Sequence, residues 1–181
     1  MQGRAKSRGK ESMGSLWTDL TIQEEKDFQD RVQRIAGDPR CLRMKAYIQH
    51  GRVTTYDHCM DVARTAFVLN RRLHVHANEG RLVRAAFLHD YFLYDWHLQG
   101  DFLHGYHHPH IAAMNARRDF ELDPAEVQAI ESHMWPLTLF HAPASRIAWM
   151  VTVADKLCSS RETLMRRRSR RFSLYRDASK E

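Results

Sequence analysis

The sequence predicts an all-α protein with a single domain of six or seven helices. Apolar residues recur every three or four positions along most of the chain, and no segment shows the alternation of apolar and polar residues that is typical of a strand. Proline, glycine and helix-capping residues separate the apolar stripes. Because the chain has 181 residues, it is long enough for one sizeable core, whereas two full domains would be a tight fit.

The first helix is expected to begin after Thr21. Thr21 and Glu24 form a capping box, in which each side chain bonds a backbone N–H at the start of the helix. Apolar residues then follow at positions 28, 32 and 35, and Gly37 ends the run. A short second helix is expected over residues 39–50.

Two longer helices are expected over residues 56–73 and 78–92. The buried stripe of the first begins with a histidine and continues with apolar residues (His58, Val62, Ala66, Leu69 and Leu73). One face of the second also ends in a histidine (Leu82, Ala85, Ala86 and His89). Residues 93–107 lack periodicity and predict a loop rich in aromatic and histidine side chains.

Three further helices complete the predicted domain. Pro109 suits the first turn of a helix that runs to about Phe120. Asp123 followed by Pro124 favours another helix start, because aspartate caps helices and proline is tolerated in their first turn. The last helix is expected from about Ala144, with its buried stripe at positions 147, 151, 154, 155 and 158.

The positive charge of the chain lies at its two ends. The whole sequence carries +6 and has a pI near 9.5, values that on their own favour nucleic acid or an anionic surface as a partner. Residues 1–12 carry +3 and residues 166–181 carry +5, so residues 13–165 carry −2. We therefore expect a flexible basic tail over residues 1–15, a globular domain over 16–165 and a basic tail over 166–181, with any binding of nucleic acid confined to the tails.

Several classes of protein are disfavoured. No stretch approaches the roughly 18–20 apolar residues that a membrane-spanning helix needs, and the basic N-terminus lacks the apolar segment of a signal peptide. Cys41, Cys59 and Cys158 are odd in number and far apart, which argues against a disulfide framework or a zinc knuckle. The sequence thus predicts a cytoplasmic protein.

Ionisable residues occupy positions where the helical pattern calls for apolar ones. They fall on four expected helices: His58, His89, Asp90, His133 and Asp155. Burying an unpaired carboxylate costs several kcal/mol, so Asp155 requires a partner. Each residue alone is compatible with an ordinary hydrogen bond or ion pair, but their joint occurrence favours a shared metal ion. Since the set contains no thiolate, Mn, Fe, Co, Ni, Zn or Mg is favoured over a structural zinc.

The order of these residues resembles that of the HD-domain metal-dependent phosphohydrolase superfamily. Tyr56-Asp57-His58, Phe87-Leu88-His89-Asp90 and Val153-Ala154-Asp155 look like its H…HD…D signature, over about residues 54–160. The resemblance implies a single helical bundle in which His58, His89, Asp90 and Asp155 bind a metal ion.

A second metal ion is also implied by the resemblance. The segments His108-Pro109-His110-Ile111-Ala112-Ala113 and Ile130-Glu131-Ser132-His133 look like those that supply two further histidines in many members. The implied ligands are then His108 and His133, with Asp90 as the bridge between two ions.

The chain departs from the family pattern at two places. His89-Asp90-Tyr91-Phe92-Leu93 lacks the lysine of the frequent HDxxK form, which leaves the role of that lysine open. Met134-Trp135-Pro136-Leu137-Thr138 stands where one class has the GYP tripeptide, which disfavours a cyclic-di-GMP phosphodiesterase. The phrases HDYFLYDWH, HMWPLT and ADKLCSSRE look like a small bacterial subfamily of unassigned HD hydrolases.

The resemblance implies an enzyme that hydrolyses a phosphomonoester or phosphodiester with one or two divalent metal ions and an activated water. His104 is the first candidate for the proton donor, and Asp95 or His97 is the second. These side chains are equally compatible with a solvated loop or with support of the metal ligands.

Binding of a phosphorylated substrate requires cationic side chains for its phosphate and a surface on which the rest of the substrate can pack. Lys156 and Arg161 are the candidates for the phosphate, with a surface ion pair as the alternative for Arg161. The aromatic residues of 91–96 predict either a stacking wall for a nucleobase or simple packing of the core. A nucleotide is accordingly the first substrate class to test.

Two other functions fit parts of the sequence. Mixed-valent di-iron oxygenases built on the HD fold resemble the same six-ligand arrangement and cleave C–C or C–P bonds with oxygen. A binding protein whose basic ends engage RNA, DNA or anionic lipid fits the arginine-rich segment RRRSRRFSLYR.

Overall fold

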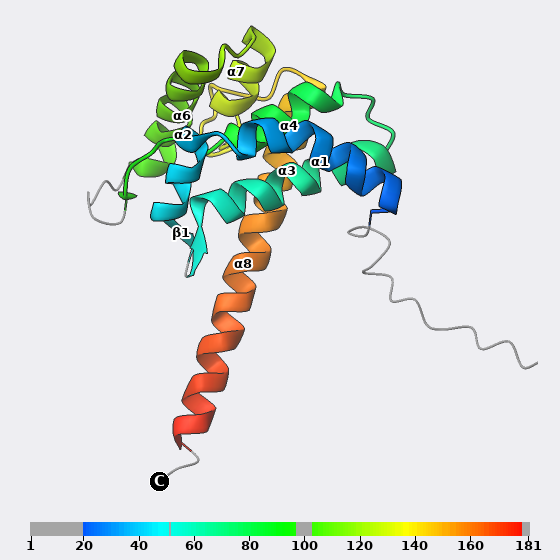
Figure 1. Cartoon of the computed structure of the whole chain (residues 1–181). Coiled ribbons are helices and arrows are strands. Elements are labelled where there is room, and N and C mark those ends of the chain that lie inside the picture. Colours follow the sequence, from blue (N-terminus) through cyan, green and yellow to red (C-terminus); the bar gives the residue numbers. More distant parts are fainter. Residues whose placement is uncertain (1–19, 51, 97–102, 179–181) are drawn as a thin grey trace, which may run out of the picture.

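Seven α-helices and a short two-stranded sheet account for most of the chain that the computed structural model describes, residues 20–50, 52–96 and 103–178 (Figure 1). The helices are α1 (Ile22–Ala36), α2 (Pro39–Leu42), α3 (Thr55–Arg72), α4 (Glu79–Leu88), α6 (His104–Phe120), α7 (Pro124–Glu131) and α8 (Arg146–Ala178). A 3-10 turn, η1 (Arg43–Ala46), and the strands β1 (Ile48–His50) and β2 (Val53–Thr54) connect α2 to α3. The prediction of an all-α fold with six or seven helices is confirmed.

Helices α3 and α4 lie at the centre of the fold (Figure 1). α3 packs against α4 and α8, while α4 also contacts α1 and α7. α6 and α8 both pack on α7. Phe67, Phe87 and Ile130 are fully buried in the core that these helices enclose. The fold therefore brings α3, α4, α6, α7 and α8 together around one interior region.

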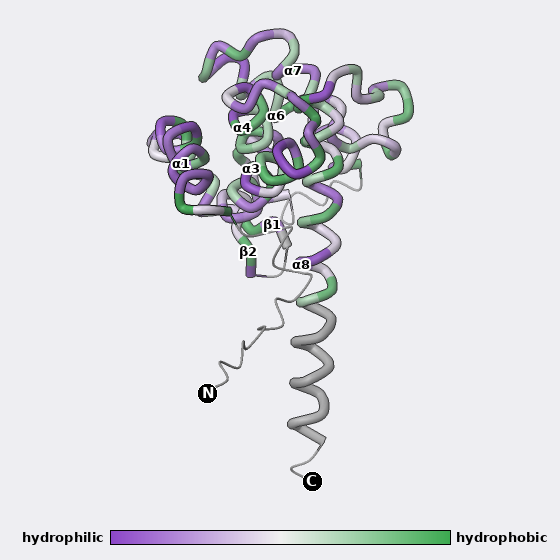
Figure 2. The backbone as a smooth tube through the Cα atoms, turned by 90° about the vertical axis from the view of Figure 1, so that its right-hand side faces the viewer, coloured by the Kyte–Doolittle hydropathy of each residue, from purple (hydrophilic) through white to green (hydrophobic). Residues whose placement is uncertain are grey.

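The predicted helix starts at Thr21 and Asp123 are confirmed. The backbone N–H of Glu24 donates to Thr21 Oγ1 (3.2 Å), and the backbone N–H of Thr21 donates to Glu24 Oε2 (2.9 Å). Asp123 caps α7 in the same way, with Glu126 as its partner. α1 buries one apolar stripe against the core and is hydrophilic over most of its length (Figure 2).

The prediction of one helix over residues 39–50 is wrong. α2 ends at Leu42, a 3-10 turn follows, and β1 pairs antiparallel with β2, so that Ile48 lies opposite Thr54. A strand of three residues is too short to show the alternation of apolar and polar side chains. This hairpin leads into α3, whose first turn is capped by Thr54.

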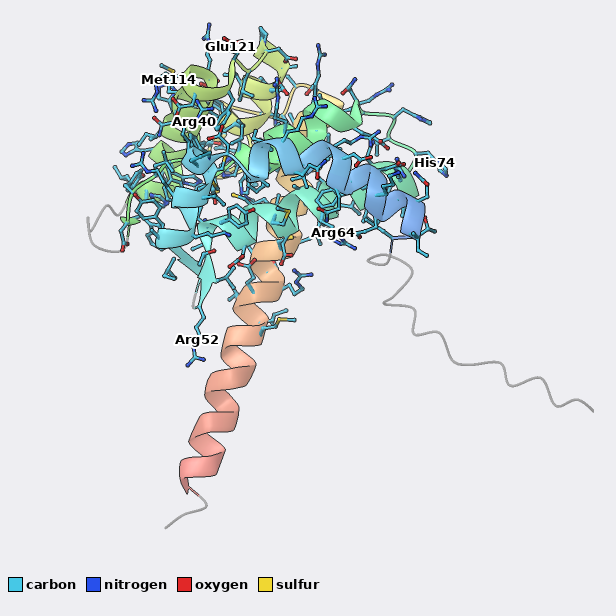
Figure 3. All side chains as sticks on the ribbon, in the orientation of Figure 1. Arg40, Arg52, Arg64, His74, Met114 and Glu121 are labelled. Carbon is cyan, nitrogen blue, oxygen red and sulfur yellow. The ribbon has the colours of Figure 1, made fainter. Side chains whose placement is uncertain are left out.

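Two helix boundaries also differ from those expected. α4 ends at Leu88, so the residues that follow form turns instead of a last helical turn. α6 begins at His104, and Pro109 therefore lies inside the helix rather than in its first turn. A proline at this position has no N–H to donate to the carbonyl four residues earlier, so α6 lacks that backbone hydrogen bond. α6 closes at Glu121, labelled in Figure 3, in the left-handed conformation (φ 49°).

α8 extends far beyond the rest of the fold (Figure 1). It begins at Arg146, close to the expected Ala144, after Ser145 accepts the backbone N–H of Ala148 (3.1 Å). The basic segment expected as a C-terminal tail continues this helix as far as Ala178. The tail expected over residues 1–15 lies outside the described residues.

Within the described ranges, no helix combines the length and the apolar character that a membrane span requires. Cys41, Cys59 and Cys158 are buried free thiols.

Candidate metal centre

Five helices or helix ends supply the six predicted ligands. His58 lies in α3, His89 caps the C-terminus of α4 and Asp90 follows it, His108 lies in α6, His133 follows α7, and Asp155 lies in α8. All six side chains are buried, with exposed fractions of 5% or less. The adjacent His89 and Asp90 side chains come together beyond the end of α4, with His89 Nε2 lying 3.4 Å from Asp90 Oδ2.

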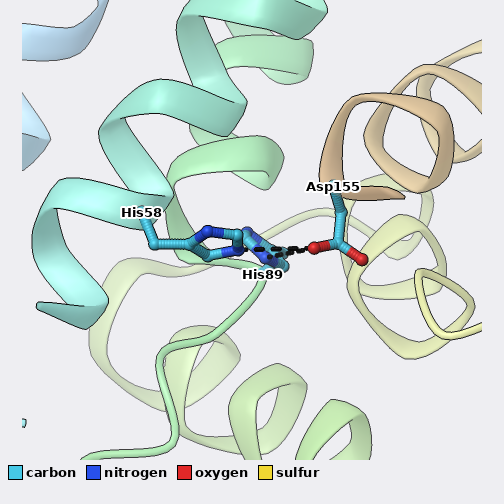
Figure 4. A group of neighbouring side chains, drawn as sticks. All are labelled: His58, His89 and Asp155. Atoms are coloured by element: carbon cyan, nitrogen blue, oxygen red, sulfur yellow. Dashed lines mark ion pairs between the residues drawn. The ribbon is translucent and has the colours of Figure 1, made fainter. Parts of the chain in front are cut away.

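The first set of ligands consists of His58, His89 and Asp155, which converge from three helices (Figure 4). Asp155 Oδ1 lies 3.3 Å from His58 Nε2 and 3.8 Å from His89 Nε2. The three ligand atoms lie within 4.8 Å of one another. Such a cluster of buried nitrogen and oxygen donors is able to hold a metal ion.

The second set consists of His108 and His133, whose Nε2 atoms are 2.9 Å apart. Each Nδ1 lies 2.8 Å from a backbone carbonyl oxygen, of His104 and Ile130 respectively. A carbonyl only accepts hydrogen bonds, so both Nδ1 atoms carry a proton and both rings turn their Nε2 towards the same point. Two Nε2 atoms directed at one point are able to bind one metal ion.

Asp90 belongs to both sets. Its Oδ2 lies 3.4 Å from His89 Nε2 and 3.9 Å from His58 Nε2. Its Oδ1 lies 3.2 Å from His108 Nε2 and 3.5 Å from His133 Nε2. Each oxygen of one carboxylate thus faces a different pair of histidines, which is the arrangement expected of a bridging ligand.

The Nδ1 atoms of the two histidines in the first set also donate hydrogen bonds. His58 Nδ1 donates to Glu162 Oε1 (2.9 Å), and His89 Nδ1 donates to the carbonyl of Ala86 (2.8 Å). In metal sites, a ligating histidine almost always donates its other N–H to a carboxylate, a carbonyl or water, which fixes the ring and its tautomer. All four histidines of the centre meet this condition.

Burial and neighbouring charges shift the protonation of the cluster in opposite directions. Burial lowers the pKa of His58, but hydrogen bonds to Asp155 and Glu162 outweigh it and raise this pKa to about 10. Burial, with nearby histidines, lowers the pKa of His133 to about 3. Burial raises the pKa of Asp90, but its histidine neighbours outweigh that effect and hold it well below the usual range. The centre therefore keeps its carboxylates ionised and His133 uncharged, while His58 holds a proton that a bound metal ion would displace.

Two polar atoms at the centre support the same conclusion. His89 Nε2 and Asp90 Oδ1 are fully buried and have no hydrogen-bond partner among the described residues. Leaving a buried polar atom unpaired costs about 1–3 kcal/mol. A metal ion would satisfy both atoms, and the donor set of imidazoles and carboxylates fits such an ion.

A cavity of about 600 Å³ opens onto the centre. Four candidate ligands line it: Asp90, His108, His133 and Asp155. The other lining residues are Gln49, Trp96, His104, Gly105, Met134, Lys156 and Ser159. Its volume lies in the range of sites for small molecules. The predicted substrate-binding Lys156 and the predicted proton donor His104 are both at this cavity.

Lys156 and Arg161 occupy different environments. Lys156 Nζ lies 2.8 Å from Asp155 Oδ2 and donates to the carbonyl of His133 (3.2 Å), so its ammonium is beside a ligand. Arg161 instead pairs with Asp61 of α3 (2.7 Å) on the surface. The ion pair that was the alternative for Arg161 is therefore present, and Arg161 is not among the residues that line this cavity.

His104 lies in a stack of rings beside the centre. Its ring is nearly parallel to those of Trp96 (centroids 4.9 Å apart) and His108 (4.6 Å), and its Nδ1 lies 2.9 Å from the hydroxyl of Tyr94. Asp95 is partly buried and does not line the cavity. His97, the other second candidate, lies outside the described residues.

The aromatic residues after Asp90 serve mainly to pack the fold. Tyr91 is fully buried and its hydroxyl donates to Asp119 Oδ2 (3.0 Å), while Phe92 packs edge-on against His104. Of the four aromatic residues considered as a stacking wall, Trp96 is the one that lines the cavity.

Three polar residues of the centre were not predicted from the sequence. Gln49 donates to Asp90 Oδ2, Ser159 donates to Asp155 Oδ1 (3.0 Å), and Glu162 accepts from His58. Ser159 and Glu162 follow Asp155 by four and seven positions, so the helical spacing of α8 was a usable signal for both. Gln49 had no such signal, because its segment was expected to be helical.

No known protein family, curated protein or solved structure matches this chain.

Proposed function

We propose that the protein is a metal-dependent phosphohydrolase of the HD-domain type that acts on a nucleotide-like phosphomonoester or phosphodiester. The observation that carries this proposal is the position of Asp90, whose two oxygens face the two pairs of histidines. Paired metal sites that share a carboxylate are suited to hydrolysis of phosphate esters.

The residues divide between two proposed ions. His58, His89, Asp155 and Asp90 Oδ2 would hold one, and His108, His133 and Asp90 Oδ1 would hold the other. When bound, divalent ions of this kind supply Lewis acidity and lower the pKa of a coordinated water. Mn, Fe, Co, Ni, Zn and Mg all accept these donors.

The chain's own residues would bind and orient the substrate. Lys156 places its ammonium at the cavity beside Asp155, where a phosphate oxygen can meet it. Trp96 offers an apolar wall to the rest of the substrate. The absence of the HDxxK lysine after Asp90 is then compensated by a lysine from α8.

His104 is the proposed proton donor to the leaving group. It lines the cavity, and the hydroxyl of Tyr94 holds one of its ring nitrogens. Its place in the ring stack fixes the plane of the imidazole beside His108. Asp95 is the second candidate for this role.

The proposal is tested by metal-dependent release of phosphate or nucleotide. Metal-free protein is reloaded with each divalent ion in turn and assayed against a panel of nucleotide monoesters and diesters, with Asp90→Ala as the inactive comparison. Asp119→Asn is a matched control, because Asp119 pairs with Arg118 and Tyr91 away from the centre. Turnover that needs the metal and Asp90 is expected, and metal-independent turnover equal in wild type and Asp90→Ala would contradict the proposal.

A di-iron oxygenase is the second candidate, because the same four imidazoles and shared carboxylate suit iron. Aerobic reconstitution with iron followed by oxygen-uptake measurements separates the two functions. Substrate-dependent oxygen uptake without release of phosphate would favour the oxygenase.

Binding of nucleic acid through the basic ends stays a prediction. A chain truncated after residue 165 is expected to keep the metal centre and to lose any salt-dependent binding of RNA or DNA. Filter binding of an RNA oligonucleotide at two salt concentrations measures this.

Replacement of Glu162 by glutamine is expected to lower the affinity for one metal ion and to leave the affinity for the other unchanged. Glu162 supports only His58, and loss of such a support typically costs 10–100-fold in metal affinity. Titration of metal-free protein with Mn²⁺ measures both affinities. The matched control is Glu131→Gln, since Glu131 pairs with the exposed His110; equal affinities in Glu162→Gln and wild type would contradict the assigned support.

A further inference from the structure

We propose that Gln49 is a positioning residue that holds the Asp90 carboxylate so that each of its oxygens faces one pair of histidines. Gln49 lies on β1, is 7% exposed and lines the cavity. It stands outside the segments that resemble the HD signature. The inference rests on the proposed two-ion centre and adds a residue that governs it.

Both ends of the Gln49 amide are engaged. Its Nε2 donates to Asp90 Oδ2 (2.5 Å), and its Oε1 accepts from Thr55 Oγ1 (3.4 Å). A carboxylate oxygen needs a donor, so the amino group is the end that faces Asp90. Thr55 is itself fixed, because its backbone N–H donates to the carbonyl of Tyr47 (2.8 Å) across the hairpin.

Asp90 requires a hydrogen bond of this kind because its carboxylate would otherwise rotate about its terminal torsion. The terminal torsion of an aspartate is broad, so the plane of the carboxylate is set by its contacts. Among the described residues, Oδ1 has no hydrogen-bond partner, whereas Oδ2 has the amide of Gln49. The direction of Oδ1 towards His108 and His133 is therefore a consequence of the hydrogen bond at Oδ2.

An amide is also the group whose charge suits this position. A lysine or arginine at position 49 would bring a positive charge that competes with the ions, and a glutamate would add a third carboxylate beside Asp90 and Asp155. Glutamine donates a hydrogen bond and leaves the net charge of the centre unchanged.

The test is titration of metal-free protein with Mn²⁺, with free Mn²⁺ followed by its electron paramagnetic resonance signal. In Gln49→Leu, both Mn²⁺ affinities are expected to fall by about 10–100-fold, because the affected carboxylate serves both ions. Glu162→Gln is expected to lower the affinity for one ion alone. The comparison therefore distinguishes a residue that positions the shared Asp90 from one that positions a single histidine ligand. The matched control is Gln128→Leu, since Gln128 donates to a loop carbonyl away from the centre and should leave both affinities unchanged.

The outcomes separate the inference from the proposed function. If wild type and Gln49→Leu bind two Mn²⁺ equally well, the role of Gln49 is overturned and the proposed centre stands. The same conclusion follows if Gln49→Leu loses affinity for one ion alone. Wild-type protein that binds no Mn²⁺, or other divalent ion, would overturn the centre itself. Gln49→Met keeps the length of the side chain without its donor, and it takes the place of Gln49→Leu if that variant does not fold, as judged by circular dichroism.

Discussion

Replacement of Asp90 by asparagine is expected to remove both metal ions and to lower phosphohydrolase activity by at least about 100-fold. Each carboxylate oxygen faces a different pair of histidines, so one substitution weakens both sets of ligands. Loss of a mere supporting residue already costs 10–100-fold in metal affinity or activity, and loss of a shared ligand exceeds that. Elemental analysis of the purified protein and the initial rate of phosphate release measure the two effects.

The stability of the metal-free variant provides the control. Asp90 is buried and the substitution preserves its shape, but the neighbouring histidines hold the pKa of Asp90 well below its usual range and so stabilise its charge in the folded protein. We therefore expect metal-free Asp90→Asn to fold but to unfold at or below the temperature of the metal-free wild type, whereas added Mn²⁺ stabilises only the wild type. A variant that keeps two ions per chain would contradict the bridging role.

Five of the six candidate ligands could be predicted from the helical pattern because they occupy positions that call for apolar residues, whereas His108 followed from the resemblance. His58 begins the stripe of α3 and Asp155 breaks that of α8, and a buried ionisable residue in such a place needs a partner. The pairing of the ligands followed from the resemblance alone. Which oxygen of Asp90 faces which histidines could not be predicted, because it depends on side-chain rotation and on Gln49.

The parts of the structure that the sequence did not determine have separate physical reasons. The three residues of β1 carry no alternating pattern, so the hairpin that supplies Gln49 was expected to be helical. Pro109 favours the first turn of a helix, yet α6 begins at His104 and accepts the proline inside it. The ion pair of Arg161 with Asp61 depends on how α8 turns against α3, which the spacing of one helix does not determine.

Removal of the Arg84 side chain is expected to cause a large loss of stability. Arg84 of α4 binds both carboxylate oxygens of Glu126 on α7, and Glu126 is fully buried. Breaking a buried ion pair on one side typically costs 3–5 kcal/mol, because it leaves an uncompensated buried charge. Since the arginine side chain is 38% exposed, we expect Arg84→Met to lower the free energy of unfolding by about 3 kcal/mol.

Urea unfolding of the metal-free protein, followed by circular dichroism, measures this loss. Adding Glu126→Gln to Arg84→Met is expected to restore more than half of it, because the second change removes the buried charge. The matched control is Arg118→Met, which breaks an exposed ion pair with Asp119 and should cost less than about 1 kcal/mol. An Arg84→Met protein as stable as the wild type would show that the pair contributes nothing.

The central claim is that six buried side chains hold two metal ions that share Asp90. The most direct test is a crystal structure of the protein grown with Mn²⁺, with the ions located by anomalous scattering. We expect two peaks, one within about 2.0–2.6 Å of ligand atoms of His58, His89 and Asp155 and the other within that distance of His108 and His133, with Asp90 contacting both. Crystals that show no peak at these residues, or peaks that Asp90 does not contact, would contradict the account.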